Sequence, residues 1–400
     1  MTFFEELKWR GLVKDISSPD LEEKLNNESL TFYWGTDPTA DSLHLGHYSS
    51  LVTAKRLMLH GHKPILLVGG ATGLIGDPRP TAEREIISKE TVEKNIEGLK
   101  RQVTRLLDNK AEVVNNYDWT KNVTFLDFLR DIGKYINVNY MLNKDIISRR
   151  LESGITYAEF SYTLLQGFDF LHLFKNKNCT LQAAGSDQWG NITTGIELIR
   201  KIEGVEAYGF TMPLILDKTG KKFGKSEGNA LWLDKEKTSP YLIYQYLLNS
   251  DDSKVIEYLK VFTFLNKEEI DALEEKVKTK PEKREAQKTL AYEVVKDLHG
   301  VEEAEKAKKT SEEVFTKGYS SEGMPSETIE YKDNMNFMDI LVMTKITTSK
   351  SEARRLIIGN GISVNNEKEL NPERIFTKEE INDLIISKGK KTHIKVNLVK

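Results

Sequence analysis

The chain has 400 residues, of which 39% are hydrophobic and 30% charged, as is typical of a soluble globular protein. Its length predicts two or three domains. The formal net charge of −3 argues against gross affinity for nucleic acid, and the single cysteine, Cys179, excludes an intrachain disulfide and favours a reducing compartment.

Targeting and membrane segments are not expected. Residues 1–8 contain acids where a signal peptide would have an uninterrupted apolar run. The most apolar stretch, residues 65–76, is too short and too rich in glycine to span a bilayer. We therefore expect a cytoplasmic protein that does not contact a membrane.

The amino-terminal half alternates short apolar runs with segments of helical spacing. Residues 31–35, 64–69 and 111–115 predict strands, and the segments that begin at 43 and 91 predict helices. Strands that alternate with helices indicate a parallel sheet with helices on both faces. We expect an α/β domain over residues 1–236.

The rest of the chain has a different texture. Residues 217–226 form a loop rich in glycine and lysine, and residues 240–317 have helical spacing throughout. Residues 318–336 hold the Gly, Ser and Pro typical of a linker. The predicted parts are a helical domain at 237–320, a linker at 321–336 and a small α+β unit at 337–400.

Charge is distributed unevenly along the chain. Residues 337–400 carry 12 Lys and Arg against 8 Asp and Glu, and the last 13 residues hold five lysines and no acid. An acidic body with a basic end suits a tail that faces RNA. On charge alone, a solvated end rich in lysine fits equally well.

Two histidines stand between the first predicted strand and its helix. His44 and His47 are three residues apart and share one face at the helix start. Gly46 leaves room there for a planar ring, and the helix N-terminus attracts phosphate. The motif suits imidazoles that donate to a phosphate under nucleophilic attack. Taken alone, the pair is more typical of two partly buried polar residues.

A second motif follows about 180 residues later. Lys222-Phe-Gly-Lys-Ser226 places two lysines three apart on a flexible loop, which could close over a triphosphate and neutralise leaving pyrophosphate. Alone, it is more typical of a solvated basic turn. The two motifs together, in this order, are much more specific than either.

The paired motifs resemble those of class I aminoacyl-tRNA synthetases, whose signatures are His-Ile-Gly-His and Lys-Met-Ser-Lys-Ser. Four further stretches resemble those of bacterial-type tyrosyl-tRNA synthetases, and this resemblance extends over essentially the whole chain. The resemblance implies a Rossmann-like catalytic domain with a connective insertion, ATP-dependent activation of tyrosine and its transfer to tRNA(Tyr). These stretches are Tyr33-x-Gly-x-Asp-Pro-Thr-Ala-Asp-Ser-Leu, Val68-Gly-Gly-Ala-Thr-Gly-Leu-Ile-Gly-Asp-Pro78, Phe160-Ser-Tyr-Thr-Leu-Leu-Gln-Gly-Phe-Asp169 and Gly185-Ser-Asp-Gln-Trp-Gly-Asn-Ile192.

The resemblance also implies a tyrosine pocket. A phenol needs both a donor and an acceptor, and Tyr33 and Asp169 are placed there. Asp169 lies between two phenylalanines and would be costly to bury without a partner. Spacing puts it on one helical face with two further polar residues. The implied tyrosine-binding set is Tyr33, Asp77, Asn116, Tyr162, Gln166, Asp169 and Gln188.

The implied ATP site needs no protein nucleophile, since the tyrosine carboxylate attacks the α-phosphate itself. Catalysis is then positioning and electrostatic stabilisation, for which Thr39, His44, His47, Lys222 and Lys225 are the expected residues. The implied ATP-binding set is Gly35, Asp37, Thr39, His44, Gly46, His47, Gly185, Asp187, Lys222, Lys225 and Ser226.

Two positions depart from the family pattern. Trp34 stands where a small residue is usual near the ribose, which puts the ATP affinity in doubt. After Asp77 the usual Ser-Gly-Lys is missing, and only Arg79 or Arg84 could supply the charge of that lysine.

The tail resembles the small RNA-binding module of ribosomal protein S-four. Lys350, Arg354 and Arg355 would form a basic helix edge suited to phosphates of tRNA. The alternative is an α+β appendage with ordinary surface charge.

The resemblance implies a homodimer through residues 125–141. Mg²⁺ is expected only as the counter-ion of ATP, because no carboxylate cage is visible. Two rivals share the architecture: a tryptophan–tRNA ligase, whose indole needs only one acceptor, and a non-catalytic RNA-binding relative, which would have no use for a closing lysine loop.

Overall fold

The computed structural model describes residues 1–78, 87–151, 154–226, 229–317, 326–365, 367–382, 384–389 and 392–399. The chain divides into two compact units. The first comprises Met1–Asp234 and Ile256–Leu265, and the second comprises Lys235–Val255 and Asn266–Lys400. A short piece of chain from the helical region, residues 256–265, thus belongs to the first unit.

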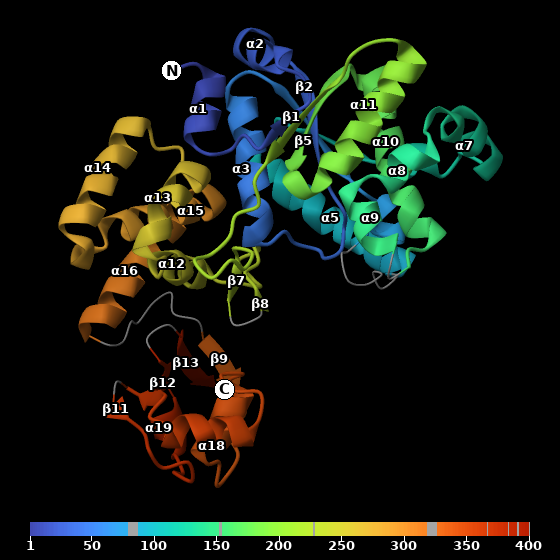
Figure 1. The fold of residues 1–400 in the computed structure, drawn as a ribbon. Helices are drawn as coiled ribbons and strands as arrows, with labels where there is room; N and C mark the ends of the chain where they lie inside the picture. The colour runs from blue at the N-terminus through green and yellow to red at the C-terminus, as the bar shows by residue number, and fades with distance from the viewer. Residues whose placement is uncertain are drawn as a thin grey trace. The chain divides into compact units, whose positions relative to one another are not determined.

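A six-stranded sheet forms the centre of the first unit (Figure 1). Its order is β1-β6-β5-β2-β3-β4, and all neighbours pair in parallel except β1 with β6. The predicted parallel sheet is confirmed. The strands are β1 (Asp15–Ile16), β2 (Thr31–Thr36), β3 (Lys63–Val68), β4 (Glu112–Asn115), β5 (Cys179–Gly185) and β6 (Tyr208–Met212).

The strand order of this sheet contains a topological switch point. From β2 the chain proceeds outward through β3 to β4, whereas β5 lies on the other side of β2 and is followed by β6. Crossovers therefore leave in opposite directions at β2 and β5. Ligands of such sheets bind at this switch point, beyond the carboxyl ends of the strands.

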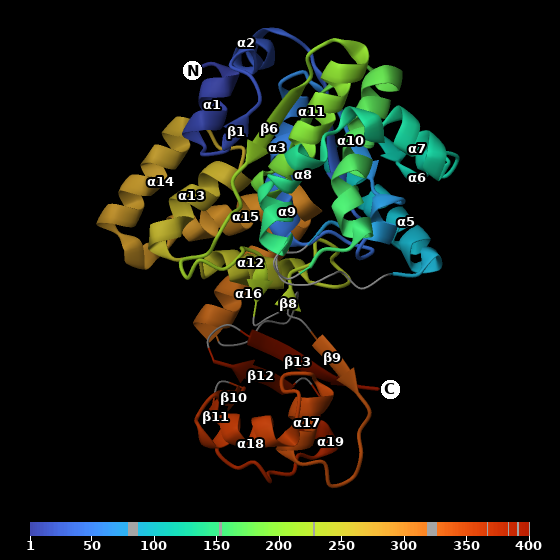
Figure 2. The same cartoon turned by 45° about the vertical axis from the view of Figure 1, so that its right-hand side comes forward.

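Helices cover both faces of this sheet, as Figures 1 and 2 show. On one face α10 and α11 pack on alternate strand residues, including Tyr33, Ile65 and Leu67. A capping box between Thr156 and Glu159 starts α10. The helices of the unit are α1 (Phe3–Trp9), α2 (Asp20–Asn27), α3 (Leu45–Leu59), α4 (Thr72–Ile75), α5 (Lys89–Leu106), α6 (Tyr117–Thr120), α7 (Phe125–Asp131), α8 (Val138–Leu142), α9 (Asp145–Leu151), α10 (Tyr157–Lys177) and α11 (Trp189–Glu203).

The lysine motif lies on a hairpin. The Phe223 N–H donates to the Ile215 carbonyl at 3.0 Å, and Leu216 bridges Lys222. Asp217 makes the turn at the tip, where its carboxylate accepts the backbone N–H groups of residues 219 and 221. The following strands are β7 (Lys225–Ser226) and β8 (Asn229–Ala230).

The second unit contains the predicted helical region and the basic tail. Its helices before the tail are α12 (Pro240–Leu248), α14 (Lys267–Thr279), α15 (Glu285–His299) and α16 (Val301–Lys317), and α13 (Asp252–Phe262) runs from this unit into the first. Pro240 follows the N-cap Ser239, where a missing N–H costs nothing. None of the described helices combines the length and the apolar character that a bilayer span requires.

The tail is built on a five-stranded sheet with the order β11-β10-β12-β13-β9. Part of the segment predicted as a linker forms a strand instead. This strand, β9, pairs in parallel with β13 and buries Ile329. The first three of residues 326–329 are polar and only Ile329 is apolar, so the sequence gives no strand pattern and the short edge strand lies in a segment of linker composition. The tail elements are β9 (Ser326–Ile329), α17 (Phe337–Met343), α18 (Lys350–Ile358), β10 (Ile362–Val364), β11 (Glu367–Lys368), α19 (Lys378–Ile381), β12 (Leu384–Lys388) and β13 (Thr392–Leu398).

Candidate active site

The first candidate group for the phenol, Tyr33, lies on β2 beside the switch point. Its side chain is 2% exposed, and its hydroxyl has no hydrogen-bond partner among the described residues. Burial and the nearby Asp169 raise the pKa of Tyr33 well above its usual value. A buried hydroxyl without a partner is costly, and a ligand that accepts from it would remove that cost.

Asp169 on α10 is equally buried and is held by two neutral donors. Asn116 Nδ2 donates to one carboxylate oxygen and Trp119 Nε1 to the other, each at 2.9 Å. Burial raises the pKa of Asp169 to about 7, although these two hydrogen bonds oppose the shift. Each oxygen keeps capacity for a further donor. Asp169 can therefore accept a phenol hydroxyl.

A second carboxylate, Asp37, continues this network. Thr72 Oγ1 donates to it at 2.8 Å and Tyr162 Oη at 2.9 Å, while Asn116 donates to Thr72. A Cβ at Gly69 would lie only 2.2 Å from Asp37 Oδ1, so glycine is required there for the carboxylate to fit. Asp37, which was predicted to bind ATP, therefore also lies beside Tyr162, one of the predicted tyrosine-binding residues.

A third carboxylate, Asp77, is held from α11. Gln188 Nε2 donates to it at 3.0 Å and Asn191 Nδ2 at 3.2 Å. The Asn191 amide also contacts the side-chain oxygens of Gln166 and Gln188 at 3.0 Å. Asn191 thus joins three of the predicted tyrosine-binding residues. These groups form a negative, amide-rich cluster suited to an ammonium.

The two histidines lie together at the start of α3. Their rings stack with centroids 3.9 Å apart, and each Nδ1 accepts a backbone N–H, from Gly46 for His44 and from His44 for His47. A neutral imidazole that accepts at Nδ1 carries its proton on Nε2. Both rings are thereby oriented as Nε2–H donors at a helix N-terminus.

The two signature motifs are in backbone contact. A Cβ at Gly46 would lie 3.1 Å from the Phe223 carbonyl oxygen, and a Cβ at Gly224, whose φ is +88°, would lie 2.5 Å from the Gly46 nitrogen. The predicted room for a planar ring is not found at the Gly46 Cβ position, because the His44 ring and the Phe223 carbonyl face it. Glycine serves here to let the lysine hairpin approach α3.

The remaining predicted ATP residues lie around the same strand ends. Gly35 is near the end of β2 and Gly185 at the end of β5, and Thr39, Asp187 and Lys222 are exposed. Lys225 pairs with Ala230 through the backbone, but its side chain and that of Ser226 lie outside the described residues.

Of the two departures from the family pattern, the structure describes Trp34 but not the loop after Asp77. Trp34 is 4% exposed and packs within β2, so most of its ring is buried. Arg79 and Arg84 lie outside the described residues, and the proposed replacement of the missing lysine stays a prediction.

Sequence reasoning missed four polar residues of the site. Thr72 and Asn191 fall inside stretches that carry the family resemblance, which was a usable signal, whereas Trp119 and Gln182 had none. Gln182 is the register neighbour of Tyr33 on β5, and its buried Oε1 has no partner among the described residues. It is a second buried group that a ligand could complete.

In the tail, two of the three predicted RNA-binding residues are already paired with acids. Lys350 lies 2.6 Å from Asp339, and Arg354 lies 2.9 Å from Glu373. Arg355 is exposed and pairs with no acid among the described residues. The predicted basic edge is therefore partly neutralised.

Comparisons with known proteins agree across the whole chain. A family model for tRNA synthetases class I (W and Y) matches residues 25–316, and one for the tyrosine–tRNA ligase SYY-like C-terminal domain matches residues 316–396. The chain is 46% identical to tyrosine–tRNA ligase 1 of Bacillus subtilis over 98% of both chains, and 47% identical to tyrosine–tRNA ligase of Bacillus pumilus over the same shares.

A solved structure has the same fold. It is a C-terminally truncated mitochondrial tyrosyl-tRNA synthetase from Aspergillus nidulans, 32% identical, with a TM-score of 0.71 over 78% of this chain and 94% of that one. The tail match and the full-length identity both favour the tyrosine branch over the tryptophan branch. The chain therefore belongs to the class I aminoacyl-tRNA synthetases, in the tyrosine–tRNA ligase family.

Proposed function

We propose that the pocket between β2, β5 and α10 binds L-tyrosine and catalyses its activation by ATP, before transfer to tRNA(Tyr). The observation that carries this proposal is the buried Tyr33 hydroxyl without a partner, set beside the carboxylate of Asp169. A phenol would accept from the first and donate to the second. Phenylalanine would leave the Tyr33 hydroxyl without an acceptor and would donate no hydrogen bond to Asp169, and an indole would serve only the acceptor.

The ammonium of the substrate would be bound at the other end of α10. Asp77 and Asp37 supply negative charge there, and Tyr162 and Gln166 supply oxygens. The hydrogen bond from Gln188 to Asp77 would hold Gln188 near the substrate carboxylate. Because every one of these side chains has a fixed partner, the pocket is organised before substrate binds.

In the reaction, a tyrosine carboxylate oxygen attacks the α-phosphorus of ATP. The new P–O bond forms as the bond to the bridging oxygen of pyrophosphate breaks, and no proton transfer is needed. His44 and His47 would donate from Nε2 to phosphate oxygens as charge develops. Lys222 and Lys225 would neutralise the leaving pyrophosphate.

ATP would enter as its magnesium complex. Within the described ranges, no group of three or more His, Cys, Asp or Glu side chains is arranged to hold a metal ion. Phosphates and water would therefore supply most of the Mg²⁺ ligands, which is the usual arrangement for this ion.

A homodimer through the connective segment is supported by its exposed apolar side chains. Phe125, Leu126 and Val138 are 64%, 74% and 59% exposed on α7 and α8. Such a patch on a monomer is typical of an interface. Leu126→Glu should convert a dimer to a monomer in sedimentation analysis, and a wild-type chain that sediments as a monomer would contradict the proposal.

The tail would hold tRNA through phosphate contacts from Arg355 and its neighbours, and the protein would act in the cytoplasm. The decisive assay for the activation step is exchange of pyrophosphate into ATP by the full chain with tyrosine, tryptophan or phenylalanine. We expect exchange with tyrosine alone. Exchange with tryptophan, or with no amino acid, would reject the proposal.

A further inference from the structure

Two arginines of the first unit are buried, and neither belongs to the proposed tyrosine or ATP site. Arg10 at the end of α1 is 3% exposed, and Arg56 on α3 is 5% exposed. Glu6 is an acidic partner of both: its Oε1 lies 2.7 Å from Arg10 Nε and 3.9 Å from Arg56 Nη1. Each buried guanidinium has further N–H donors, which also need acceptors.

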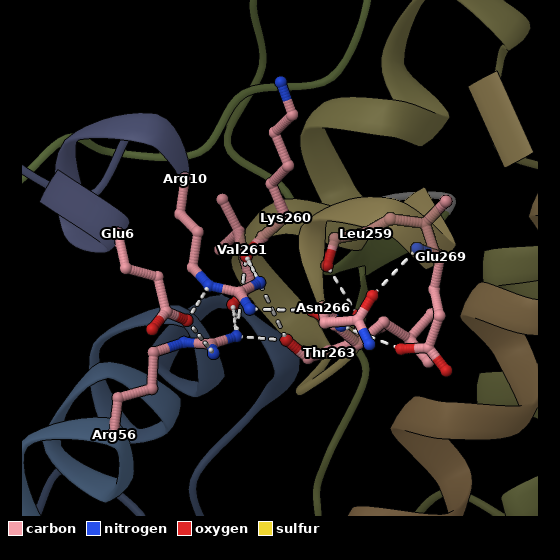
Figure 3. Close-up of polar contacts among 10 residues, drawn as sticks. Glu6, Arg10, Arg56, Leu259, Lys260, Val261, Thr263, Asn266 and Glu269 are labelled. Carbon is pink, nitrogen blue, oxygen red and sulfur yellow. Dashed lines mark hydrogen bonds and ion pairs between the residues drawn. The ribbon is translucent and has the colours of Figure 1, made fainter. Parts of the chain in front are cut away.

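The end of α13 supplies backbone carbonyl oxygens as acceptors for both guanidinium groups, as Figure 3 shows. Arg10 donates to the carbonyl oxygens of Lys260 at 2.9 Å and of Leu265 at 2.7 Å. Arg56 donates to those of Val261 at 3.2 Å and Thr263. The last carbonyls of a helix have no partner within it and carry partial negative charge. The two arginines therefore clamp this helix end.

The clamped helix end carries the side chains that hold the lysine hairpin. Phe262 and Tyr258, four residues apart on α13, each have their ring centroid 4.7 Å from that of Phe223. The Tyr258 hydroxyl also donates to the Leu216 carbonyl at 3.1 Å, on the opposite strand of the hairpin. Phe223 is 4% exposed. Phe223, the second residue of the lysine motif, is thus anchored to α13.

The same helix end also aligns the hairpin with the histidines. Phe262 stacks on Tyr48 of α3, next to His47, with ring centroids 5.8 Å apart. Arg56 lies further along α3. The start of α3 and the hairpin therefore both contact the end of α13, and the close approach of Gly224 to Gly46 leaves little tolerance for a shift.

We propose that Arg10 and Arg56 are positioning residues for adenylate formation: by clamping the end of α13 they set the position of the Phe223 anchor, and with it Lys222 and Lys225 over the histidines. The proposal rests on the function proposed for those two lysines. It predicts that loss of the clamp impairs the step in which pyrophosphate leaves and spares the binding of tyrosine, whose residues lie on other elements.

The test compares Arg56→Met, which removes the charge and the donors, with Arg56→Lys, which keeps the charge but not the fork that reaches two carbonyls. Tyrosine binding is titrated without ATP, and kcat is measured by pyrophosphate exchange. We expect Arg56→Met to lower kcat about ten- to hundredfold, as for a misplaced catalytic group. Tyrosine affinity should stay unchanged and Arg56→Lys should recover part of the rate.

Two comparisons separate positioning from loss of stability. Ile199→Ala removes core volume from α11 in the same unit and is the control for reduced stability, with kcat expected to stay normal. In a Phe223→Leu background the anchor is already weakened, so Arg56→Met should lower kcat by a clearly smaller factor than it does in the wild type. Three outcomes would each overturn the proposal. The first is that the losses of kcat in Arg56→Met and Phe223→Leu add up in the double variant. The others are an equal loss of kcat in Ile199→Ala and a normal kcat in Arg56→Met.

Lys222→Ala is measured in parallel. If it has no effect on kcat, the proposed role of the lysine loop fails. If it slows exchange while Arg56→Met does not, only the clamp proposal fails. Should Arg56→Met not bind tyrosine because it does not fold, Arg56→Lys with intact tyrosine binding carries the test, and its normal turnover would reject the clamp.

Discussion

The proposed tyrosine pocket and the predicted basic edge of the tail hold their charged side chains in opposite ways. In the pocket the carboxylate of Asp169 is buried and held by neutral donors, Asn116 and Trp119. On the tail Arg354 is exposed and held by an opposite charge, Glu373. A buried carboxylate with neutral partners stays available to a ligand. An exposed ion pair is worth at most about 1 kcal/mol and competes with the ligand for the same charge.

The largest effect is expected from Asp169→Ala. It removes the acceptor of the phenol and leaves the donors of Asn116 and Trp119 without a partner. We expect kcat/KM for tyrosine to fall on the order of 10³-fold, since a charged hydrogen bond is lost in a buried site. Pyrophosphate exchange and circular dichroism measure activity and fold. Wild-type exchange from a folded variant would remove the basis of tyrosine specificity.

A charged residue that acts mainly in the transition state should have the next largest effect. Lys225→Ala should slow adenylate formation by about 10²-fold and barely change tyrosine affinity. Single-turnover kinetics and a tyrosine titration separate the two quantities. Lys221→Ala, on the same hairpin, controls for the change of charge. Normal turnover with weakened tyrosine binding would assign Lys225 to the wrong step.

Removing the tail tests the other region as a whole. Because β9 belongs to the tail sheet, the chain should end after Lys317. Exchange should stay near normal, since the pocket residues all lie in the first unit, whereas tRNA charging should fall by more than about tenfold as several phosphate contacts are lost. A truncated chain that charges tRNA normally would show that the tail is a structural appendage.

These regions also differ in how far their residues could be predicted. Periodicity located β2, β3 and α5 because their apolar spacing reflects a buried face. Spacing put Tyr162, Gln166 and Asp169 on one helical face, and in α10 each reaches a pocket partner. Their roles came from family resemblance. Trp119 had no signal, because its contact joins segments 50 residues apart.

On the tail, composition predicted the positive charge but not its partners. Asp339 and Glu373 lie 11 and 19 residues from Lys350 and Arg354, and only the fold brings them together. The contacts of Arg10 and Arg56 with the end of α13 could not be predicted for the same reason, since they join residues 205 to 255 positions apart. Contacts of this kind arise from tertiary packing, and the spacing of residues along the sequence does not predict them.

The raised pKa of Asp169 predicts a pH effect of intermediate size. Above its pKa of about 7 the carboxylate accepts the phenol, and below it the proton competes. Tyrosine affinity should therefore fall roughly tenfold from pH 8 to pH 6. Because the folded state holds this proton more tightly than the unfolded one, the free energy of unfolding should decrease as pH rises from about 4 to about 7.

Asp169→Asn is the control for this titration. It should bind tyrosine weakly but with the same affinity at both pH values, because the side chain that titrates is gone. Isothermal titration of tyrosine without ATP measures the affinity directly. A wild-type affinity that is constant between pH 6 and pH 8 would mean that Asp169 stays ionised over this range.

The smallest effects concern single charges on the tail, and their opposite signs make them informative. Arg355→Gln should weaken tRNA binding a few-fold and flatten the plot of log affinity against log salt by roughly 0.7–0.9, the loss of one phosphate contact. Glu373→Gln should strengthen tRNA binding and steepen the salt dependence, because it frees Arg354 from a partner that competes with phosphate. Glu379→Gln, an exposed acid on α19, controls for net charge alone. Titrations of tRNA at several salt concentrations give affinity and slope together. If Glu373→Gln and Glu379→Gln behave alike, Arg354 does not meet the RNA, and the helix edge reduces to Arg355.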